Sequence, residues 1–184
     1  PGEDLKQRLE KNGGPLAEAD AAGWAQEILD ALNYLHTLQP PVVHRDIKPG
    51  NIKITPEGRA VLVDFGLAKV HDLKQTTTVG AKALTPGFAP PEQYGVGRTD
   101  PRTDIYSLAA TLYNLLTNQI PADSLERAIG NQKLVPMRAA NPQISANVAE
   151  AIERGLSVKP EDRWATAAEF AQALGGREPT QPAM

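Results

Sequence analysis

His44-Arg45-Asp46-Ile47-Lys48-Pro49-Gly50-Asn51 and, thirteen residues after it, Asp64-Phe65-Gly66 are the two most informative stretches of this sequence. Each is polar and adjoins a short apolar run. Asp46 carries a carboxylate that can accept a proton from a hydroxyl group, and Lys48 carries a cation that can lie against a phosphate. Asn51 and Asp64 supply oxygen ligands, which a hard divalent cation such as magnesium prefers. Together these residue types provide what phosphoryl transfer requires.

The segment between the two stretches predicts a β-hairpin. Ile52-Lys53-Ile54 alternates like a strand, residues 55–58 carry a turn signal, and residues 60–63 predict a second strand that returns antiparallel. Because Asn51 directly precedes the first strand and Asp64 directly follows the second, the hairpin brings both side chains to one end. The sequence therefore predicts that these two residues reach the same cations.

The two stretches resemble the catalytic loop and the metal-binding loop of the eukaryotic-type, or Hanks-type, protein kinases. Residues 85–94, Thr-Pro-Gly-Phe-Ala-Pro-Pro-Glu-Gln-Tyr, and residues 99–108, Thr-Asp-Pro-Arg-Thr-Asp-Ile-Tyr-Ser-Leu, are similar to phrases of the bacterial serine/threonine branch. The resemblance covers nearly the whole chain. It implies transfer of a phosphate from ATP, with Mg²⁺, to serine or threonine hydroxyl groups of protein substrates.

Length and periodicity predict a single folded domain. At 184 residues, 41% of them apolar and 22% charged, the chain is long enough for a buried core. Apolar residues at helical spacing predict helices around the hairpin, whereas residues 67–103 have the composition of a long loop. The expected fold class is therefore α+β and mainly helical. The expected helices span residues 3–11, 17–38, 104–116, 124–130, 148–156 and 165–174.

The resemblance also implies a domain organisation. Residues 1–176 resemble the C-terminal lobe of a kinase domain, with the catalytic loop at 44–51, Asp-Phe-Gly at 64–66 and the activation segment at 64–92, and residues 177–184 resemble a linker or tail. The glycine-rich loop, the strand lysine and its glutamate partner, which belong to the N-terminal lobe, are absent from this chain. Because activity in the family requires that lysine–glutamate pair, we expect the chain alone to be inactive, the missing lobe to be a required partner, and the face it covers to be exposed.

Charge and composition exclude several other classes. The net charge of −3 gives no reason to expect nucleic acid as a partner. The absence of cysteine excludes disulfides and cysteine-based zinc sites, which fits a reducing cytoplasm. No apolar run approaches the roughly twenty residues of a membrane span, so we expect a cytoplasmic chain. A membrane anchor after residue 184, as in many bacterial relatives, stays open for the full-length protein.

By resemblance, four polar residues carry the chemistry. Asp46 orients the substrate hydroxyl and accepts its proton, and Lys48 neutralises charge on the transferred phosphate of the nucleotide. Asn51 and Asp64 hold magnesium. Outside this motif, the same residues would be interpreted as a turn-forming aspartate, a solvated lysine and a pair of strand caps.

Two further residues are nucleotide-binding candidates. Lys53 stands where relatives usually place an apolar side chain beneath the adenine. We expect its methylene stem to form this floor while its ammonium reaches outward to water. Glu3 lies in the segment that resembles the residues directly after the hinge.

Arg45 and several threonines are regulatory candidates. A cation directly before the catalytic aspartate is costly unless an anion approaches it. In relatives with this arrangement a phosphorylated threonine of the activation loop supplies that anion. The candidates here are Thr76, Thr77 and Thr78. Thr85 instead resembles the threonine that hydrogen-bonds near the catalytic aspartate and lysine, and the alternative for the threonine run is a merely flexible polar loop.

Five residues are expected to support the site. By resemblance, His44 and Phe65 belong to a stacked apolar column, Glu92 pairs with Arg163, and Asp104 accepts hydrogen bonds from catalytic-loop amides. The alternative for Asp104 is an ordinary helix cap.

A non-enzymatic function is the main alternative. A pseudokinase or scaffold would recruit protein partners through the helical lobe without catalysis. The intact set of Asp46, Lys48, Asn51 and Asp64 argues against it, because a scaffold has no physical need for these residues. Ala109, which replaces a glycine of the family's central helix, is a departure that we expect to be tolerated.

Overall fold

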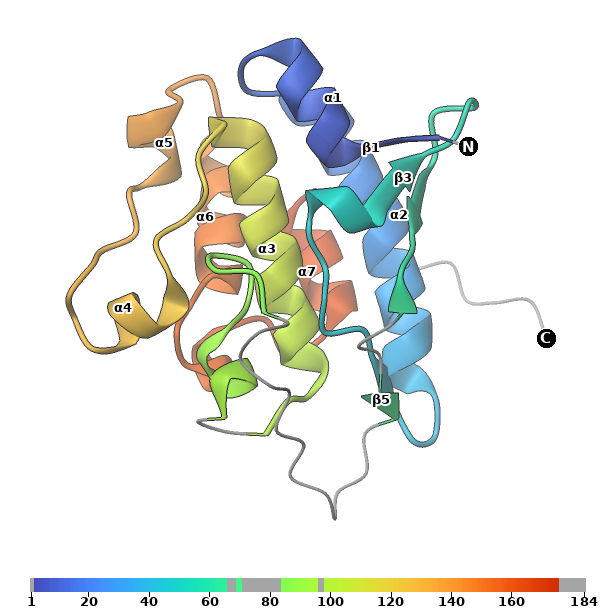
Figure 1. The fold of residues 1–184 in the computed structure, drawn as a ribbon, viewed down its shortest axis with the longest axis vertical. Helices are drawn as coiled ribbons and strands as arrows, with labels where there is room; N and C mark the ends of the chain where they lie inside the picture. The colour runs from blue at the N-terminus through green and yellow to red at the C-terminus, as the bar shows by residue number, and fades with distance from the viewer. Residues whose placement is uncertain (1, 66–68, 71–83, 96–97, 176–184) are drawn as a thin grey trace.

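The computed structural model of the chain describes residues 2–65, 69–70, 84–95 and 98–175. Helices surround a central helix, α3, and a small sheet lies beside α2 at one end of the molecule (Figure 1). The predictions made for Gly66, for the run Thr76, Thr77 and Thr78, and for the tail 177–184 lie outside the described residues.

Helix α3 (Pro101–Thr117) is the centre of the core, and every residue from Thr103 to Thr117 is buried. It begins at Asp100, whose side chain accepts a hydrogen bond from the backbone N–H of Arg102, with proline at the first helical position. Buried hydroxyl groups along the helix bond to carbonyl oxygens one turn earlier, so they need no other partner. Helices α2 (Glu18–Thr37), α6 (Ala146–Gly155) and α7 (Ala167–Ala173) pack against α3 and each other.

Two small sheets hold the polar loops in place. The first has the order β1–β3–β4, formed by Glu3–Asp4, Ile52–Ile54 and Ala60–Leu62, and the second pairs Val42–Val43 (β2) with Lys69–Val70 (β5). The predicted hairpin is present, with Ile52 opposite Leu62. The prediction that residues 3 and 4 are helical is wrong. They pair with β3, and helix α1 (Leu5–Asn12) starts only after Asp4, whose carboxylate caps it.

The hairpin is fixed to α2 by side chains that bond to its turn. The indole N–H of Trp24 donates to the carbonyl oxygen of Gly58 over 3.2 Å. The carboxylate of Glu27 accepts from the guanidinium of Arg59 and from the backbone N–H of Ala60. Because alternate strand residues face opposite sides, Ile52 and Ile54 lie in the core with their partners Leu62 and Ala60. Lys53 and its partner Val61 face outward.

Several short elements were not predicted. The long connection 67–103 contains β5 and a 3₁₀ turn, Pro91–Tyr94, and a further helix, α5 (Met137–Ala140), precedes α6. The predicted helix at 124–130 is shorter, Ser124–Ala128 (α4). No helix among the described residues is long and apolar enough to cross a membrane.

Ala109 of α3 is accommodated by a glycine on the neighbouring helix. A Cβ atom placed on Gly155 of α6 would lie 2.8 Å from the Cβ atom of Ala109, closer than real Cβ contacts come. The methyl group that α3 carries is therefore compensated by the missing methyl group on α6. This contact explains why the departure at Ala109 is compatible with the close packing of α3 and α6.

Candidate active site

The carboxylate of Asp46 is held on both of its oxygen atoms. Lys48 Nζ lies 3.0 Å from Asp46 Oδ1, and Asn51 Nδ2 donates to Asp46 Oδ2 over 2.8 Å and to the Asp46 carbonyl oxygen over 2.7 Å. The 3₁₀ turn Pro49–Asn51 makes this possible because it folds Asn51 back over the loop. The carboxylate therefore has a fixed direction.

The hairpin places Asp64 next to Asn51. The backbone N–H of Val63 donates to the carbonyl oxygen of Asn51 over 2.9 Å, so Asp64 is the first residue after the paired part of the hairpin. Asp64 has a φ of 64°, which turns the chain sharply, and its side chain is exposed. The predicted juxtaposition of the two residues at one end of the hairpin is present.

The donor set at this end fits magnesium. Both atoms that face the Asn51 amide nitrogen only accept hydrogen bonds, so its oxygen is directed elsewhere and stays available as a ligand. Asp64 adds a carboxylate. No cluster of three or more histidine, aspartate or glutamate side chains able to hold a metal occurs in the described part of the chain. A two-ligand site is what Mg²⁺ uses when substrate phosphates and water complete its octahedron.

Asp104 organises the start of the catalytic loop. Its Oδ2 accepts from the backbone N–H of His44 over 2.9 Å, and its Oδ1 accepts from that of Arg45 over 2.8 Å. It is not the cap of α3, because that position is Asp100 and Asp104 lies in the first turn, fully buried. Sequence reasoning missed His36 of α2, whose Nε2 lies 2.9 Å from Asp104 Oδ2.

Arg45 occupies an unusual backbone conformation. Its φ of 71° lies in the left-handed region, which a residue with a side chain adopts only when its surroundings impose it. Its side chain is buried. Burial lowers the pKa of the Arg45 guanidinium, and the negative charge of Asp104 acts in the opposite direction.

His44 does more than pack. Its ring meets the ring of Phe65 edge-on, with 4.7 Å between the ring centroids. In addition, its Nδ1 lies 3.3 Å from the backbone nitrogen of Asp46 and its Nε2 lies 3.2 Å from the carbonyl oxygen of Val63. Since the first partner donates and the second accepts, the hydrogen of the neutral ring belongs on Nε2. His44 thus joins the catalytic loop to the end of the hairpin.

Thr85 lies against the catalytic loop. Lys48 Nζ donates to Thr85 Oγ1 over 3.1 Å while it also contacts Asp46. The described part of the activation segment therefore reaches the lysine directly. Thr85 and Asp46 lie together on the wall of a small internal void.

Glu92 and Arg163 form a buried ion pair, 71 residues apart in sequence. Two guanidinium nitrogens donate to the two carboxylate oxygens over 2.7 and 3.0 Å. Thr103 also donates to Glu92, and three backbone carbonyl groups accept from Arg163, so every charged atom has a partner. Removing one partner of such a pair costs about 3–5 kcal/mol because the other charge stays buried.

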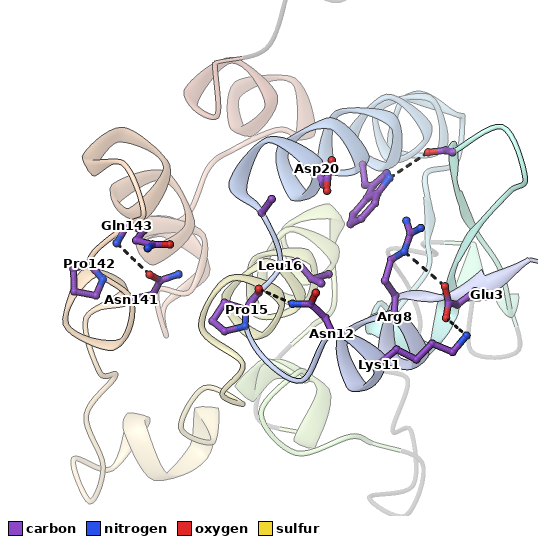
Figure 2. Close-up of a pocket in the computed structure, with 13 residues that line it drawn as sticks. Glu3, Arg8, Lys11, Asn12, Pro15, Leu16, Asp20, Asn141, Pro142 and Gln143 are labelled. Atoms are coloured by element: carbon purple, nitrogen blue, oxygen red, sulfur yellow. Dashed lines mark hydrogen bonds and ion pairs between the residues drawn. The ribbon is translucent and has the colours of Figure 1, made fainter.

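The two nucleotide-binding candidates lie on paired strands, β1 and β3, but their side chains make different ion pairs. Lys53 faces outward from β3 with its side chain 38% exposed, and its Nζ also lies 2.9 Å from Asp4 Oδ2. Glu3 is turned away, and its carboxylate contacts Lys11 (2.6 Å) and Arg8 (3.7 Å) on the wall of a wide hollow of 1130 Å³ (Figure 2). The Glu3 carboxylate is thus engaged by two basic residues of α1 and not by the polar side chains of the catalytic loop.

An apolar hollow lies on the outer face of the hairpin. It has a volume of 430 Å³, and its lining residues are Gly2, Lys53, Ile54, Thr55, Pro56, Val61 and Val63. Val61 is 44% exposed, and Phe65, which follows β4, is 48% exposed. Large apolar side chains this accessible mark a face suited to contact with another body.

The fold and this arrangement of side chains are those of a protein kinase, and the chain belongs to the protein kinase family, whose model, described as "Protein kinase domain", matches residues 1–174. Within the family it is similar to bacterial serine/threonine kinases of the Hanks type. It is 37% identical over 186 residues to serine/threonine-protein kinase F of Synechocystis sp., and 36% identical over 177 residues to serine/threonine-protein kinase PknH of Mycobacterium tuberculosis.

Solved kinase structures have the same fold. The structure titled "PpkA-294 apo form" superposes with a TM-score of 0.76 at 32% identity, and the M. tuberculosis PknI kinase domain with 0.73 at 26% identity. The matches cover 94% and 95% of this chain but only 60% and 61% of those chains. The matches to the two curated relatives cover 98% and 94% of this chain. The chain, however, spans only 36% and 28% of the length of those relatives.

Proposed function

We propose that this chain is the C-terminal lobe, residues 1–176, of a serine/threonine protein kinase that transfers phosphate from Mg-ATP to hydroxyl groups of proteins. The observation that carries the proposal is the Asp46 carboxylate, held between Lys48 and Asn51 and adjacent to Asp64. The share of the solved kinase chains that is matched supports the lobe assignment, since about two fifths of each remains for another part of the domain.

The four residues divide the work as follows. Asp46 orients the substrate hydroxyl and takes its proton as the oxygen attacks phosphorus. Lys48, which already contacts Asp46 and Thr85, places a positive charge beside the transferred phosphate. Asn51 and Asp64 would hold Mg²⁺, which when bound neutralises phosphate charge. Asn51 has a second task, because its amide nitrogen keeps Asp46 in place.

The nucleotide would lie over the hollow on the outer face of the hairpin. The stem of Lys53 forms part of its floor, and the ion pair with Asp4 draws the ammonium to one side. We propose that a smaller N-terminal lobe covers this face and supplies the other phosphate contacts. The exposed Val61 and Phe65 support this requirement, and the chain alone is expected to be inactive.

Phosphorylation of the activation segment is the proposed gate. Once phosphorylated, one of the candidates Thr76, Thr77 and Thr78 would supply an anion to the region of Arg45. The kinase would act in the cytoplasm, where ATP and its protein substrates are available. The arginine's buried position next to the catalytic aspartate supports this role.

The test is a phosphate-transfer assay on the full-length protein that contains this chain, with labelled ATP, Mg²⁺ and a general protein substrate. Transfer by the wild type, its loss in Asp46→Asn and its absence from the isolated 184 residues are expected. No transfer by the full-length wild type after phosphorylation of its activation segment would favour the scaffold function. Transfer by the isolated chain would refute the requirement for a second lobe.

A further inference from the structure

Gln93 is a buried glutamine whose side chain bonds to the catalytic loop. Its Nε2 lies 2.7 Å from the carbonyl oxygen of Arg45, 48 residues away in sequence, and only 3% of its surface is exposed. Because a carbonyl oxygen only accepts, the amide nitrogen must face it and the amide oxygen must face elsewhere. That oxygen is buried and has no hydrogen-bond partner among the described residues.

The carbonyl group that Gln93 holds belongs to the peptide plane joining Arg45 to Asp46. The N–H at the other edge of the same plane is Asp46 N–H, which faces His44 Nδ1. The preceding peptide N–H, that of Arg45, is held by Asp104. The φ of 71° at Arg45 lies in the left-handed region, which is less favourable for a residue with a side chain, so hydrogen bonds from the surroundings are needed to keep this conformation. Rotation of the plane would swing the Asp46 side chain, so its anchors set the direction of the carboxylate.

The element that carries Gln93 is itself firmly anchored. Gln93 lies in the 3₁₀ turn Pro91–Tyr94. On one side, Glu92 is bound to Arg163 and Thr103 in the core. On the other, the hydroxyl of Tyr94 donates to Asp123 over 3.1 Å. Because Glu92 and Tyr94 are both held, the turn keeps the Gln93 amide group in position against the carbonyl oxygen of Arg45.

A purely structural role does not account for a glutamine here. An amide oxygen buried without a partner destabilises the folded state, and an apolar side chain of the same length would avoid that cost. The hydrogen bond to the Arg45 carbonyl oxygen is what an apolar replacement would lose. Gln93 also lines the same small void as Asp46 and Thr85, so the group lies beside the reacting part of the loop.

We infer that Gln93 is a positioning residue: by holding the Arg45–Asp46 peptide plane, it couples the end of the activation segment to the direction of the Asp46 carboxylate. The inference rests on the proposed kinase function. It predicts a loss in the rate of phosphate transfer with little change in nucleotide binding, because Gln93 touches neither phosphate nor metal ligands.

The test uses the full-length kinase and three variants. Gln93→Met keeps the length but removes the donor, and Gln93→Glu keeps the shape but replaces the donor with an acceptor. The matched control is Gln26→Met. Gln26 Nε2 also donates to a distant backbone carbonyl group, that of Ala171, over 2.9 Å, but between α2 and α7. The measurements are kcat, KM for ATP and the melting temperature of each variant.

Both Gln93 variants are expected to lose about tenfold to a hundredfold in kcat, with KM for ATP within about twofold of the wild type. Gln26→Met is expected to keep the wild-type kcat although its melting temperature falls about as far as that of the Gln93 variants. A folded Gln93→Met with wild-type kcat overturns the inference, as does an equal loss in Gln26→Met. If neither Gln93 variant folds, the side chain acts through stability and the inference also fails. If the wild-type kinase transfers no more phosphate than Asp46→Asn, the proposed kinase function is refuted, and the inference that rests on it fails as well.

Discussion

The side-chain nitrogen of Asn51 lies 2.8 Å from the carboxylate of Asp46 and 2.7 Å from its carbonyl oxygen, so one amide group fixes both ends of the proposed base. The oxygen of the same amide is left for a cation. Under the proposed function, Asn51 would serve both the proton acceptor and the metal, so its removal should have two separable consequences.

In Asn51→Ala we expect kcat to fall about 10²–10³-fold, because Asp46 loses the donor that directs it. The Mg²⁺ concentration for half-maximal activity should rise by about tenfold or more, since a ligand is lost. Steady-state kinetics of the full-length kinase across a magnesium titration measure both. The control is Asn131→Ala, an exposed asparagine that bonds only within its own turn region to Glu126. An unchanged magnesium requirement would remove Asn51 from the metal site.

The hairpin and the juxtaposition of Asn51 and Asp64 could be predicted because both follow from local alternation and a short turn. The strand Glu3–Asp4 could not, because two residues carry no period and the polar pattern that follows is helical. The contacts of His36 with Asp104 and of Gln93 with Arg45 join residues 68 and 48 positions apart. No pattern of sequence spacing predicts such pairs. The packing of α2, α3 and the 3₁₀ turn Pro91–Tyr94 brings their side chains together.

The contact between Gly155 and Ala109 yields a stability prediction. In Gly155→Ala, the overpacking cost of about 1–3 kcal/mol should outweigh the roughly 0.5–1 kcal/mol that alanine gains over glycine in a helix. Adding Ala109→Gly should restore part of the loss, because it removes the opposing methyl group. Urea unfolding of the two single variants and the double variant gives the coupling free energy.

Gly23→Ala is the control for that cycle. Gly23 is an exposed residue of α2, and a Cβ atom placed there meets nothing within 4 Å. It should stabilise the protein by about 0.5–1 kcal/mol. Strictly additive free energies for Gly155→Ala and Ala109→Gly would show that the two positions do not compete for space.

The carboxylate of Asp4 is expected to make the free energy of unfolding depend on pH. Burial raises the pKa of Asp4, but hydrogen bonds from Gln7 N–H and Lys53 and the charge of Lys53 outweigh it, so the pKa lies below its usual range. A carboxyl group with a lowered native pKa adds stability above its unfolded-state pKa and loses it as the pH falls through the native value. Asn caps helices as well as Asp, so Asp4→Asn removes the charge alone.

The free energy of unfolding of Asp4→Asn should therefore fall short of the wild type at pH 6, and the gap should close as the pH drops below 3.8, the value for an unperturbed aspartate. Urea titrations at a series of pH values measure the gap. Asp30→Asn, at an exposed position of α2, controls for general charge effects. A gap that widens in acid would mean that the carboxylate is not stabilised by its neighbours.

Lys53 tests how the proposed nucleotide site tolerates a charged residue in its floor. If the methylene stem supplies the apolar surface and Asp4 holds the ammonium aside, Lys53→Leu gains little, and the wild type should bind Mg-ATP at least as tightly. Breaking the half-exposed pair with Asp4 should cost no more than about 1 kcal/mol of stability. Calorimetric titration of the full-length kinase measures the affinity, with Lys133→Leu, an exposed position, as control. Clearly tighter binding by Lys53→Leu would show that the ammonium obstructs the nucleotide and that the Lys53 stem is not a suitable floor for it.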